Sequence, residues 1–304
     1  MRLAGVLLVL ALAPLASGPD PAPTLAVRAS GGWETWWRAD SAPERWNAPL
    51  PAVADRVKWR GAGRGLDWGE LTLSGDGEAF RVRVIAVRVD PGAFEFRLIL
   101  PARAGAFAGR WDIGEAPSEA SLALNAGQFT DEPWGWVVQD GVERQSPRGG
   151  PLAVAVVLDT LGRLHLLSTD SIASIRPATR LAFQSYPLLL GGDGEVPRAL
   201  VDSSLGVNLR HRDSRLALGE LRDGRIILAL TRFEALGGVL ASLPLGLTTP
   251  EMAALMGALG ARRAVLLDGG ISSQLMIRDG ARHRSWTGWR RVPLGLIGIP
   301  RAAR

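Results

Sequence analysis

A short polar segment near the C-terminus carries residue types that suit hydrolytic chemistry. Asp268 follows the apolar run 264–267, and four flexible or hydroxyl-bearing residues come soon after it: Gly269, Gly270, Ser272 and Ser273. A carboxylate can act as a base or nucleophile, while hydroxyls and backbone N–H groups can bind an anionic or hydroxyl-rich ligand. The same pattern suits a plain β-hairpin turn that Asp268 merely caps, because Asp-Gly is a strong hairpin signal.

Four further residues are candidates for the same site. Asn125 and Gly127 lie in a polar turn after an apolar run, and Arg215 opens a strand pattern. Asn125 could instead satisfy loop backbone groups, and Arg215 could pair with Asp213 or Glu220. The serines belong to no recognisable triad motif, so a serine hydrolase is not expected. Of the three histidines, His211 is nearest to Arg215 in sequence and is the reserve acid or base.

Strand patterns dominate the chain that must position these residues. Alternation of apolar and polar residues predicts strands at 66–73, 80–89 and 94–100, which we expect to form an antiparallel meander. Hairpins are predicted at 152–167 and 215–231. Strands outnumber helices, so we expect an α+β fold with mixed, twisted β-sheets and few helices.

One helix is clearly signalled, immediately before the run that ends at Asp268. Thr248 and Glu251 form a capping-box pattern, and Pro250 suits the first turn. One apolar stripe follows, and Gly260 supplies the stop. The helix is therefore expected to lead into the strand that delivers the carboxylate.

The N-terminus differs in composition from the rest of the 304 residues. Residues 1–18 carry Arg2, an apolar run and small residues, which predicts a cleaved signal peptide. The mature protein is then expected to be exported, periplasmic or secreted, without a transmembrane span. Residues 19–64 are rich in Pro and Trp and are expected to form an irregular extension packed on a main domain, 65–304. The Trp residues could form a sugar-stacking platform, but indoles that cover a core edge are commoner.

Cysteine usage and charge limit the possible partners. The chain has no Cys, and no loop of the EF-hand kind, so neither a metal nor a cofactor is predicted. The net charge is +5 and nucleic acid is not expected, because no binding motif is present. The tail is locally basic, with Arg278, Arg282, Arg284, Arg290, Arg291, Arg301 and Arg304. It is either a solvated surface or a docking face for phosphate or an anionic polymer.

Four motifs in order resemble the phosphodiester glycosidase family. They are Asn-Ala-Gly-Gln-Phe at 125–129, Gln-Ser-Tyr-Pro-Leu-Leu at 184–189, Arg-Leu-Ala-Leu-Gly at 215–219 and Leu-Asp-Gly-Gly-Ile-Ser-Ser at 267–273. The resemblance covers roughly residues 66–300. Departures from the family pattern fall at Ala126, Gln128, Tyr186, Leu216 and Ile271, and each could reshape a sugar pocket.

The resemblance implies an exported hydrolase that cleaves a sugar-1-phosphodiester bond in envelope or exopolysaccharide material. A carbohydrate or glycosyl phosphate would be the substrate. Asp268 and Arg215 would be catalytic, and the substrate-binding residues would be Asn125, Gly127, Gly269, Gly270, Ser272, Ser273 and His211. A non-catalytic glycan-binding or polysaccharide-assembly protein on the same fold is the alternative, and cleavage at P–O instead of C–O is a weaker one. The sequence predicts no oligomeric state.

Overall fold

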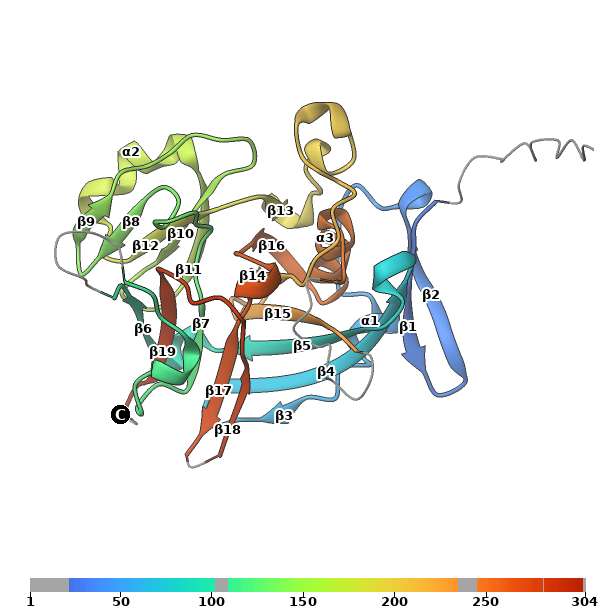
Figure 1. Ribbon diagram of the computed structural model, residues 1–304, viewed down its shortest axis with the longest axis horizontal. Helices are drawn as coiled ribbons and strands as arrows, with labels where there is room; N and C mark the ends of the chain where they lie inside the picture. The colour runs from blue at the N-terminus through green and yellow to red at the C-terminus, as the bar shows by residue number, and fades with distance from the viewer. Residues whose placement is uncertain (1–21, 102–108, 235–244, 281, 303–304) are drawn as a thin grey trace, which may run out of the picture.

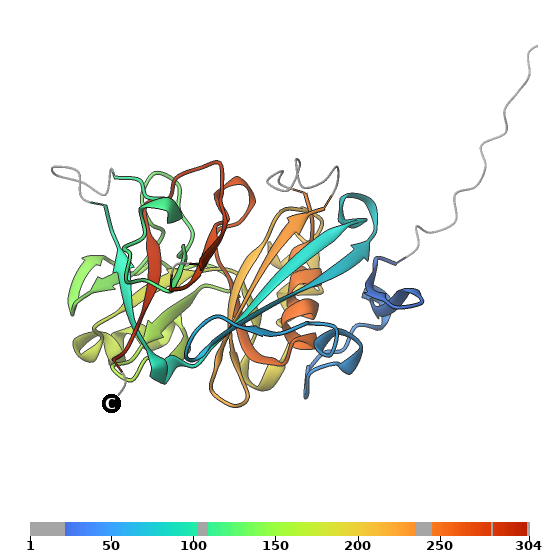
Figure 2. The same ribbon diagram turned by 90° about the horizontal axis from the view of Figure 1, so that it is seen from below.

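The computed structural model describes residues 22–101, 109–234, 245–280 and 282–302, and its strands form three sheets (Figures 1 and 2). The expected signal peptide, 1–18, lies outside the described residues. The α+β class with few helices is confirmed. The sheets are not mixed, because every strand pair in the described parts of the chain is antiparallel.

The largest sheet has nine strands and is covered on both faces. Its order is β13 (Leu188–Leu190), β16 (Ala261–Leu266), β14 (Leu216–Leu221), β15 (Ile226–Phe233), β5 (Val82–Val89), β4 (Leu66–Gly75), β1 (Thr24–Ala29) and β2 (Gly32–Arg38), with β3 (Arg60–Gly61) beside β4. Alternate residues of β5 enter different cores: Val84 and Ala86 face the helical side, while Ile85 and Val87 face the smaller sheets. Strand alternation with apolar residues on both faces therefore builds a central layer.

Helix α3 (Thr249–Ala258) covers one face of this sheet, and the short helices are α1 (Pro51–Ala54) and α2 (Ile172–Ile175) (Figure 1). The predicted capping box of Thr248 and Glu251 is confirmed, and Gly260 ends the helical segment with a φ of +96°. The predicted apolar stripe is too narrow, since every α3 residue except Pro250 is buried. No helix in the described ranges is both long and apolar enough to cross a membrane.

Gly257 lets α3 approach the N-terminal segment closely. A Cβ at Gly257 would lie 2.2 Å from Cγ of Trp46, a residue that is 8% exposed. We expect Gly257→Ala to destabilise the protein by about 1–3 kcal/mol through overpacking, although Ala gains about 1 kcal/mol in helix propensity. Thermal unfolding measures this. Adding Trp46→Leu should relieve part of the loss, and a raised melting temperature for Gly257→Ala alone would contradict the contact.

Two five-stranded sheets lie against the other face of the large sheet (Figure 2). One has the order β11 (Leu164–Ser168), β10 (Val154–Leu158), β12 (Ala182–Ser185), β8 (Val137–Gln139) and β9 (Val142–Gln145). The other has the order β18 (Arg282–Trp286), β17 (Leu275–Asp279), β7 (Leu122–Asn125), β19 (Gly295–Pro300) and β6 (Phe94–Ile99). The predicted hairpins β10–β11 and β14–β15 are confirmed. The predicted meander ends after β5, because β6 pairs with β19 in a different sheet.

The N-terminal extension is more regular than its composition indicates. Strands β1 and β2 form a hairpin, β1 pairs with β4 of the large sheet, and β2 is the edge strand. Leu25 and Val27 of β1 are fully buried, and Trp37 is 7% exposed. The extension packs on the main domain as expected, but the expectation that it is irregular is wrong, because β1 continues the sheet.

The acidic turn after β16 is not a hairpin. Strand β16 pairs with β13 and β14, whereas β17 pairs with β7 and β18. Residues 267–274 therefore carry the chain from the large sheet into a smaller one. This passage between two sheets places Asp268 where elements from both meet.

Candidate active site

Backbone contacts from two other motifs fix the position of Asp268. Its N–H donates to the carbonyl of Gly127 at 3.0 Å, and its carbonyl accepts from Nδ2 of Asn125 at 2.8 Å. One residue earlier, the N–H of Leu267 donates to the carbonyl of Leu216 in β14. Three of the sequence motifs thus meet at the backbone of residues 267 and 268.

Asn125 clamps both ends of the acidic turn. It ends β7 and is fully buried, and its Oδ1 accepts from the N–H of Gln274 at 2.9 Å while its Nδ2 binds the carbonyl of Asp268. These partners are backbone groups, as one reading of the sequence proposed. Asn125 therefore acts on the site by positioning Asp268.

The paired glycines allow the turn to lie against residues 213–214. A Cβ at Gly269 would lie 2.6 Å from the carbonyl oxygen of Ser214, and one at Gly270 would lie 2.8 Å from Oδ2 of Asp213. The N–H of Gly270 donates to the same Ser214 carbonyl at 2.8 Å. Only Gly270 of this pair takes a positive φ, +61°. Both glycines are needed because any side chain would push the two segments apart.

Two other positions in the motifs, Gly127 and Ile271, differ in backbone conformation and in surroundings. Gly127 has a φ of +65°, and a Cβ there would lie 2.8 Å from the carbonyl oxygen of Gln184. Ile271 has no positive φ and is 39% exposed, so its departure from the family pattern strains no backbone and places an apolar side chain at the surface beside the turn.

The carboxyl group of Asp268 has an unusual environment. Burial raises its pKa to about 7, a hydrogen bond with the Ser272 side chain and the charge of Arg290 act in the opposite direction, and the charge of Asp213 raises it further. A carboxyl with such a pKa is partly ionised at neutral pH and is more basic than an ordinary aspartate. These properties suit a general base or nucleophile.

Arg232 holds three segments of the site together and was not predicted. It is 4% exposed, its Nη1 donates to Oγ of Ser214 at 2.7 Å, and its Nη2 donates to the carbonyls of Ser273 and Thr287. Burial lowers its pKa to about 10, and the charge of Asp213 raises it. It stays charged at neutral pH. The feature of the sequence that could have revealed Arg232 is its position as a charged residue within the mainly apolar run 226–233.

Asp213 adds a second carboxylate to this region. Burial raises its pKa, while the charge of Arg215, the N–H of Ser214 and His211 act to lower it. The Nε2 atom of His211 lies 3.6 Å from Oδ2 of Asp213, and the His211 side chain is 60% exposed. His211 is therefore adjacent to the Asp213 carboxylate.

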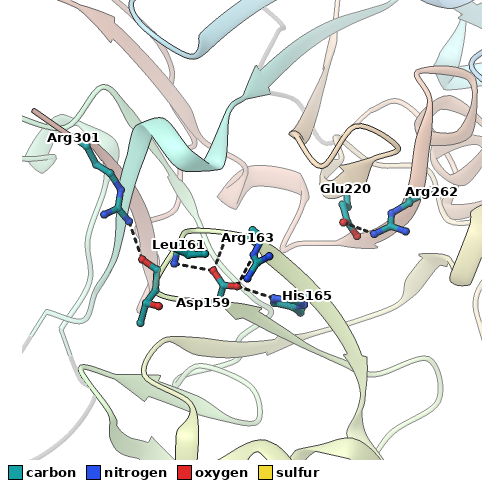
Figure 3. Close-up of polar contacts among 8 residues, drawn as sticks. Asp159, Leu161, Arg163, His165, Glu220, Arg262 and Arg301 are labelled. Carbon is teal, nitrogen blue, oxygen red and sulfur yellow. Dashed lines mark hydrogen bonds and ion pairs between the residues drawn. The ribbon is translucent and has the colours of Figure 1, made fainter. Parts of the chain in front are cut away.

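Arg215 is buried beneath the neighbouring loop. Its Nε donates to the carbonyl of Leu247 at 3.0 Å, and its Nη2 donates to the carbonyl of His211 at 2.6 Å. Burial lowers its pKa. No ion pair joins it to Asp213 or Glu220 among the described residues, and Glu220 instead pairs with Arg262 at 2.6 Å (Figure 3). The guanidinium thus holds the His211 and Leu247 backbone in place.

The other two histidines lie elsewhere. In the β10–β11 hairpin, Nε2 of His165 lies 3.2 Å from Asp159, which also accepts from Arg163 and from the N–H of Leu161 (Figure 3). His283 belongs to β18. Neither contacts the acidic turn in the described structure.

Arg290 supplies an exposed cation that acts on Asp268. Its charge lowers the pKa of that carboxyl, and its guanidinium lies 4.8 Å from the centre of the Phe129 ring. Its backbone N–H donates to the carbonyl of Ile271 at 3.0 Å. The sequence showed it only as part of a basic tail. Since Phe129 belongs to the Asn125 motif, Arg290 connects that motif to the acidic turn.

The two serines differ in their surroundings. Ser272 is 3% exposed and its side chain is hydrogen-bonded to Asp268. Ser273 is fully buried, and its Oγ has no hydrogen-bond partner within the described residues. In those same residues no group of three His, Asp or Glu side chains is arranged to hold a metal.

The sequence comparison identifies the class of protein to which this site belongs. The family described as phosphodiester glycosidase matches residues 118–297, which is 180 of the 304 residues and includes the acidic turn and its partners. The chain therefore belongs to the phosphodiester glycosidase family. No curated protein sequence matches the chain.

Three solved structures share the fold. The catalytic domain of zebrafish N-acetylglucosamine-1-phosphodiester alpha-N-acetylglucosaminidase, described as auto-inhibited by its pro-peptide, has a TM-score of 0.58 and 17% identity, covering 86% of this chain and 96% of that one. A hypothetical protein from Synechocystis has a TM-score of 0.52 and 16% identity, covering 91% and 68%. A putative exported protein from Burkholderia pseudomallei has a TM-score of 0.51 and 16% identity, covering 76% and 74%. At these identities the likeness concerns the fold.

Proposed function

We propose that this protein is a hydrolase that cleaves a sugar-1-phosphodiester bond at the anomeric carbon. The observation that carries the proposal is Asp268, a carboxyl of raised pKa held between the motifs that define the family. The zebrafish structure of the same fold carries a phosphodiester glycosidase name, which supports this substrate class.

The residues present suit the requirements of this reaction. Glycosidases usually need one carboxylic acid to protonate the leaving oxygen and a carboxylate opposite it. A phosphate leaving group has a second pKa near 6 and needs little protonation, so cationic donors can replace the acid. Asp268 is then the base that activates water or the nucleophile that attacks the anomeric carbon. Asn125 and Gly127 orient it, and Ser272 tunes it by hydrogen bonding.

Arg290 is the residue we assign to the phosphate. The resemblance implies that Arg215 is catalytic, but two of its N–H groups donate to backbone carbonyls and it is 7% exposed, so it is not free to bind the phosphate. Arg290 is exposed and close enough to influence Asp268. Arg215 then acts as a positioning residue for the segment that carries His211 and Asp213.

Arg290→Gln should raise the KM for a sugar-1-phosphodiester about ten-fold while changing kcat less, because it removes one charge-assisted contact to the substrate phosphate. Arg290→Lys should restore part of the binding, since the charge remains. Steady-state kinetics on both variants measure the effect. An unchanged KM in Arg290→Gln would remove this residue from phosphate recognition.

We further propose that the mature protein begins near Pro19 and acts on envelope or exopolysaccharide material after export. The pattern of residues 1–18 supports this, since it has the charged start, apolar run and small residues of a signal peptide. N-terminal sequencing of protein recovered from the envelope or medium tests it. Material that still begins at Met1 would contradict processing.

A product screen of the mature chain against a panel of sugar-1-phosphodiesters tests the activity. Release of free sugar together with a phosphate monoester is expected. Ligand binding without any turnover would favour the alternative, a glycan-binding or assembly protein. Ile271 is relevant to the choice between these two functions, because its exposed side chain lies at the acidic turn, where a departure from the family pattern can reshape a sugar pocket.

A further inference from the structure

A groove away from Asp268 gathers several of the basic residues of the C-terminal tail. It has a volume of about 600 Å³ and lies between strands β3–β4 of the large sheet and the β17–β18 hairpin, which are neighbours in Figure 1. The charged and aromatic residues that line it are Arg60, Trp68, Asp279, Arg282, His283 and Arg284. None of them belongs to the site described above.

The positive charge of the groove is only partly compensated. Three arginines face one aspartate, which gives a formal charge of 3 − 1 = +2 with His283 neutral. In the described part of the chain, none of Arg60, Arg282 and Arg284 takes part in an ion pair, although many other arginines do, such as Arg212 with Glu251 and Arg83 with Glu70. A basic concave surface without internal partners attracts anions.

Trp68 holds two of the arginines in place. The guanidinium of Arg60 lies 5.2 Å from the indole centroid and that of Arg284 lies 4.7 Å from it. Trp68 as a whole is only 5% exposed, and Trp286 packs against its indole with ring centroids 5.9 Å apart. Trp68 therefore offers no open face on which a sugar could stack. A stacked guanidinium keeps the N–H donors at its edge available for phosphate or carboxylate.

The β17–β18 hairpin joins this groove to the candidate active site. At one end Leu275 pairs with Trp286, next to Gln274 and Thr287, whose backbone groups bind Asn125 and Arg232. At the other end Asp279 pairs with Arg282. The four strand steps between them span about 13 Å at roughly 3.3 Å per residue. One end of the hairpin therefore contacts residues of the candidate active site, and the other end lies at the groove.

We propose that this groove binds a second anionic segment of a phosphate-bearing polysaccharide whose scissile phosphodiester lies at Asp268. The inference rests on the proposed function and narrows it, because it makes the substrate a polymer instead of a small sugar phosphodiester. Charge complementarity selects the phosphate-bearing chain over a neutral glycan.

The test compares binding and turnover of phosphomannan, of mannan without phosphate and of a small sugar-1-phosphodiester. Arg282→Gln combined with Arg284→Gln should weaken phosphomannan binding about ten-fold, a loss that added salt reproduces in the wild type. KM for the small substrate should stay unchanged. Arg282→Gln alone leaves the Trp68 stack intact and should show part of the effect. Arg28→Gln is the matched control, since Arg28 is exposed and stacks on Trp33 at 5.4 Å outside the groove.

Three results would contradict the proposal that the groove binds a phosphate-bearing polysaccharide. They are wild-type phosphomannan binding in the double variant, an equal loss in Arg28→Gln, and equal affinity for mannan and phosphomannan. A raised KM for the small substrate would show that the arginines act at Asp268 instead. The binding measurement needs no turnover. If the protein binds phosphomannan through the groove but hydrolyses nothing, the proposed function fails while the groove stands.

Discussion

Asp268→Asn should lower turnover of a sugar-1-phosphodiester by two to four orders of magnitude, roughly the contribution of a positioned acid or base. The structure explains why this substitution isolates the chemistry. Gly127 and Asn125 hold residue 268 through its backbone N–H and carbonyl, so both contacts persist in the variant. An amide side chain also keeps a hydrogen-bonding group next to Ser272.

The pKa of Asp268 gives the expected pH dependence. Because the ionised carboxylate is the reactive form, kcat/KM of the wild type should rise with pH through about 7. The folding stability that depends on this group should change with pH in the opposite direction. The pKa in the folded protein lies above the ordinary value of 3.8, so ionisation costs stability as pH rises from that value through about 7.

Asn cannot ionise, so above pH 7 the Asp268→Asn variant avoids this cost. Its melting temperature at pH 8 should equal or exceed that of the wild type. Loss of activity with no loss of stability is the signature of a residue retained for function. A variant that melts lower and stays active per folded molecule would make Asp268 structural, and a stable, active variant would remove it from the site.

Arg232→Met should destabilise the protein by about 3–5 kcal/mol, because it removes three hydrogen bonds from a buried charged donor and leaves Ser214, Ser273 and Thr287 without that partner. Thermal or denaturant unfolding measures the loss. Turnover of the folded fraction should also fall, since the segments on either side of Asp268 lose their common anchor.

Arg83→Met is the control for Arg232→Met. The two arginines are register partners in β5 and β15, but the Arg83 side chain is 40% exposed and pairs with Glu70. A surface pair of this kind contributes about 0–1 kcal/mol. Arg232→Lys should lie between wild type and Arg232→Met because it keeps the charge but fewer donors. Equal stability of the Arg232→Met and Arg83→Met variants would contradict the anchoring role.

Local features of the fold were predictable, while long-range pairings were not. The β10–β11 and β14–β15 hairpins and the α3 capping box depend on residues a few positions apart, and all three are confirmed. Strand β6 leaves the meander for a different sheet, and the chain after β16 likewise enters a different sheet. Both changes depend on partner strands that are far away in sequence. Alternation within a strand says which face is buried and does not say which strand lies alongside.

The candidate site shows the same limit. Motif order proposed Asp268, Asn125 and the glycines as site residues, and the structure brings these residues into contact. Arg232 and Arg290 were missed as site residues because the groups on which they act are distant from them in sequence and are brought close only by the fold. The Pro-rich and Trp-rich composition of residues 19–64 likewise gave no indication of β1, which pairs with β4 in the large sheet and buries Leu25 and Val27.

Hydrolysis of a sugar-1-phosphodiester in oxygen-18 water tests the central claim most directly. If Asp268 directs water to the anomeric carbon, or forms a glycosyl intermediate that water resolves, the label enters the sugar and the phosphate monoester stays unlabelled. Unlabelled sugar added to the same water corrects for exchange at the anomeric position. Oxygen-18 in the phosphate product would show cleavage at P–O and would contradict glycosidase chemistry at this site.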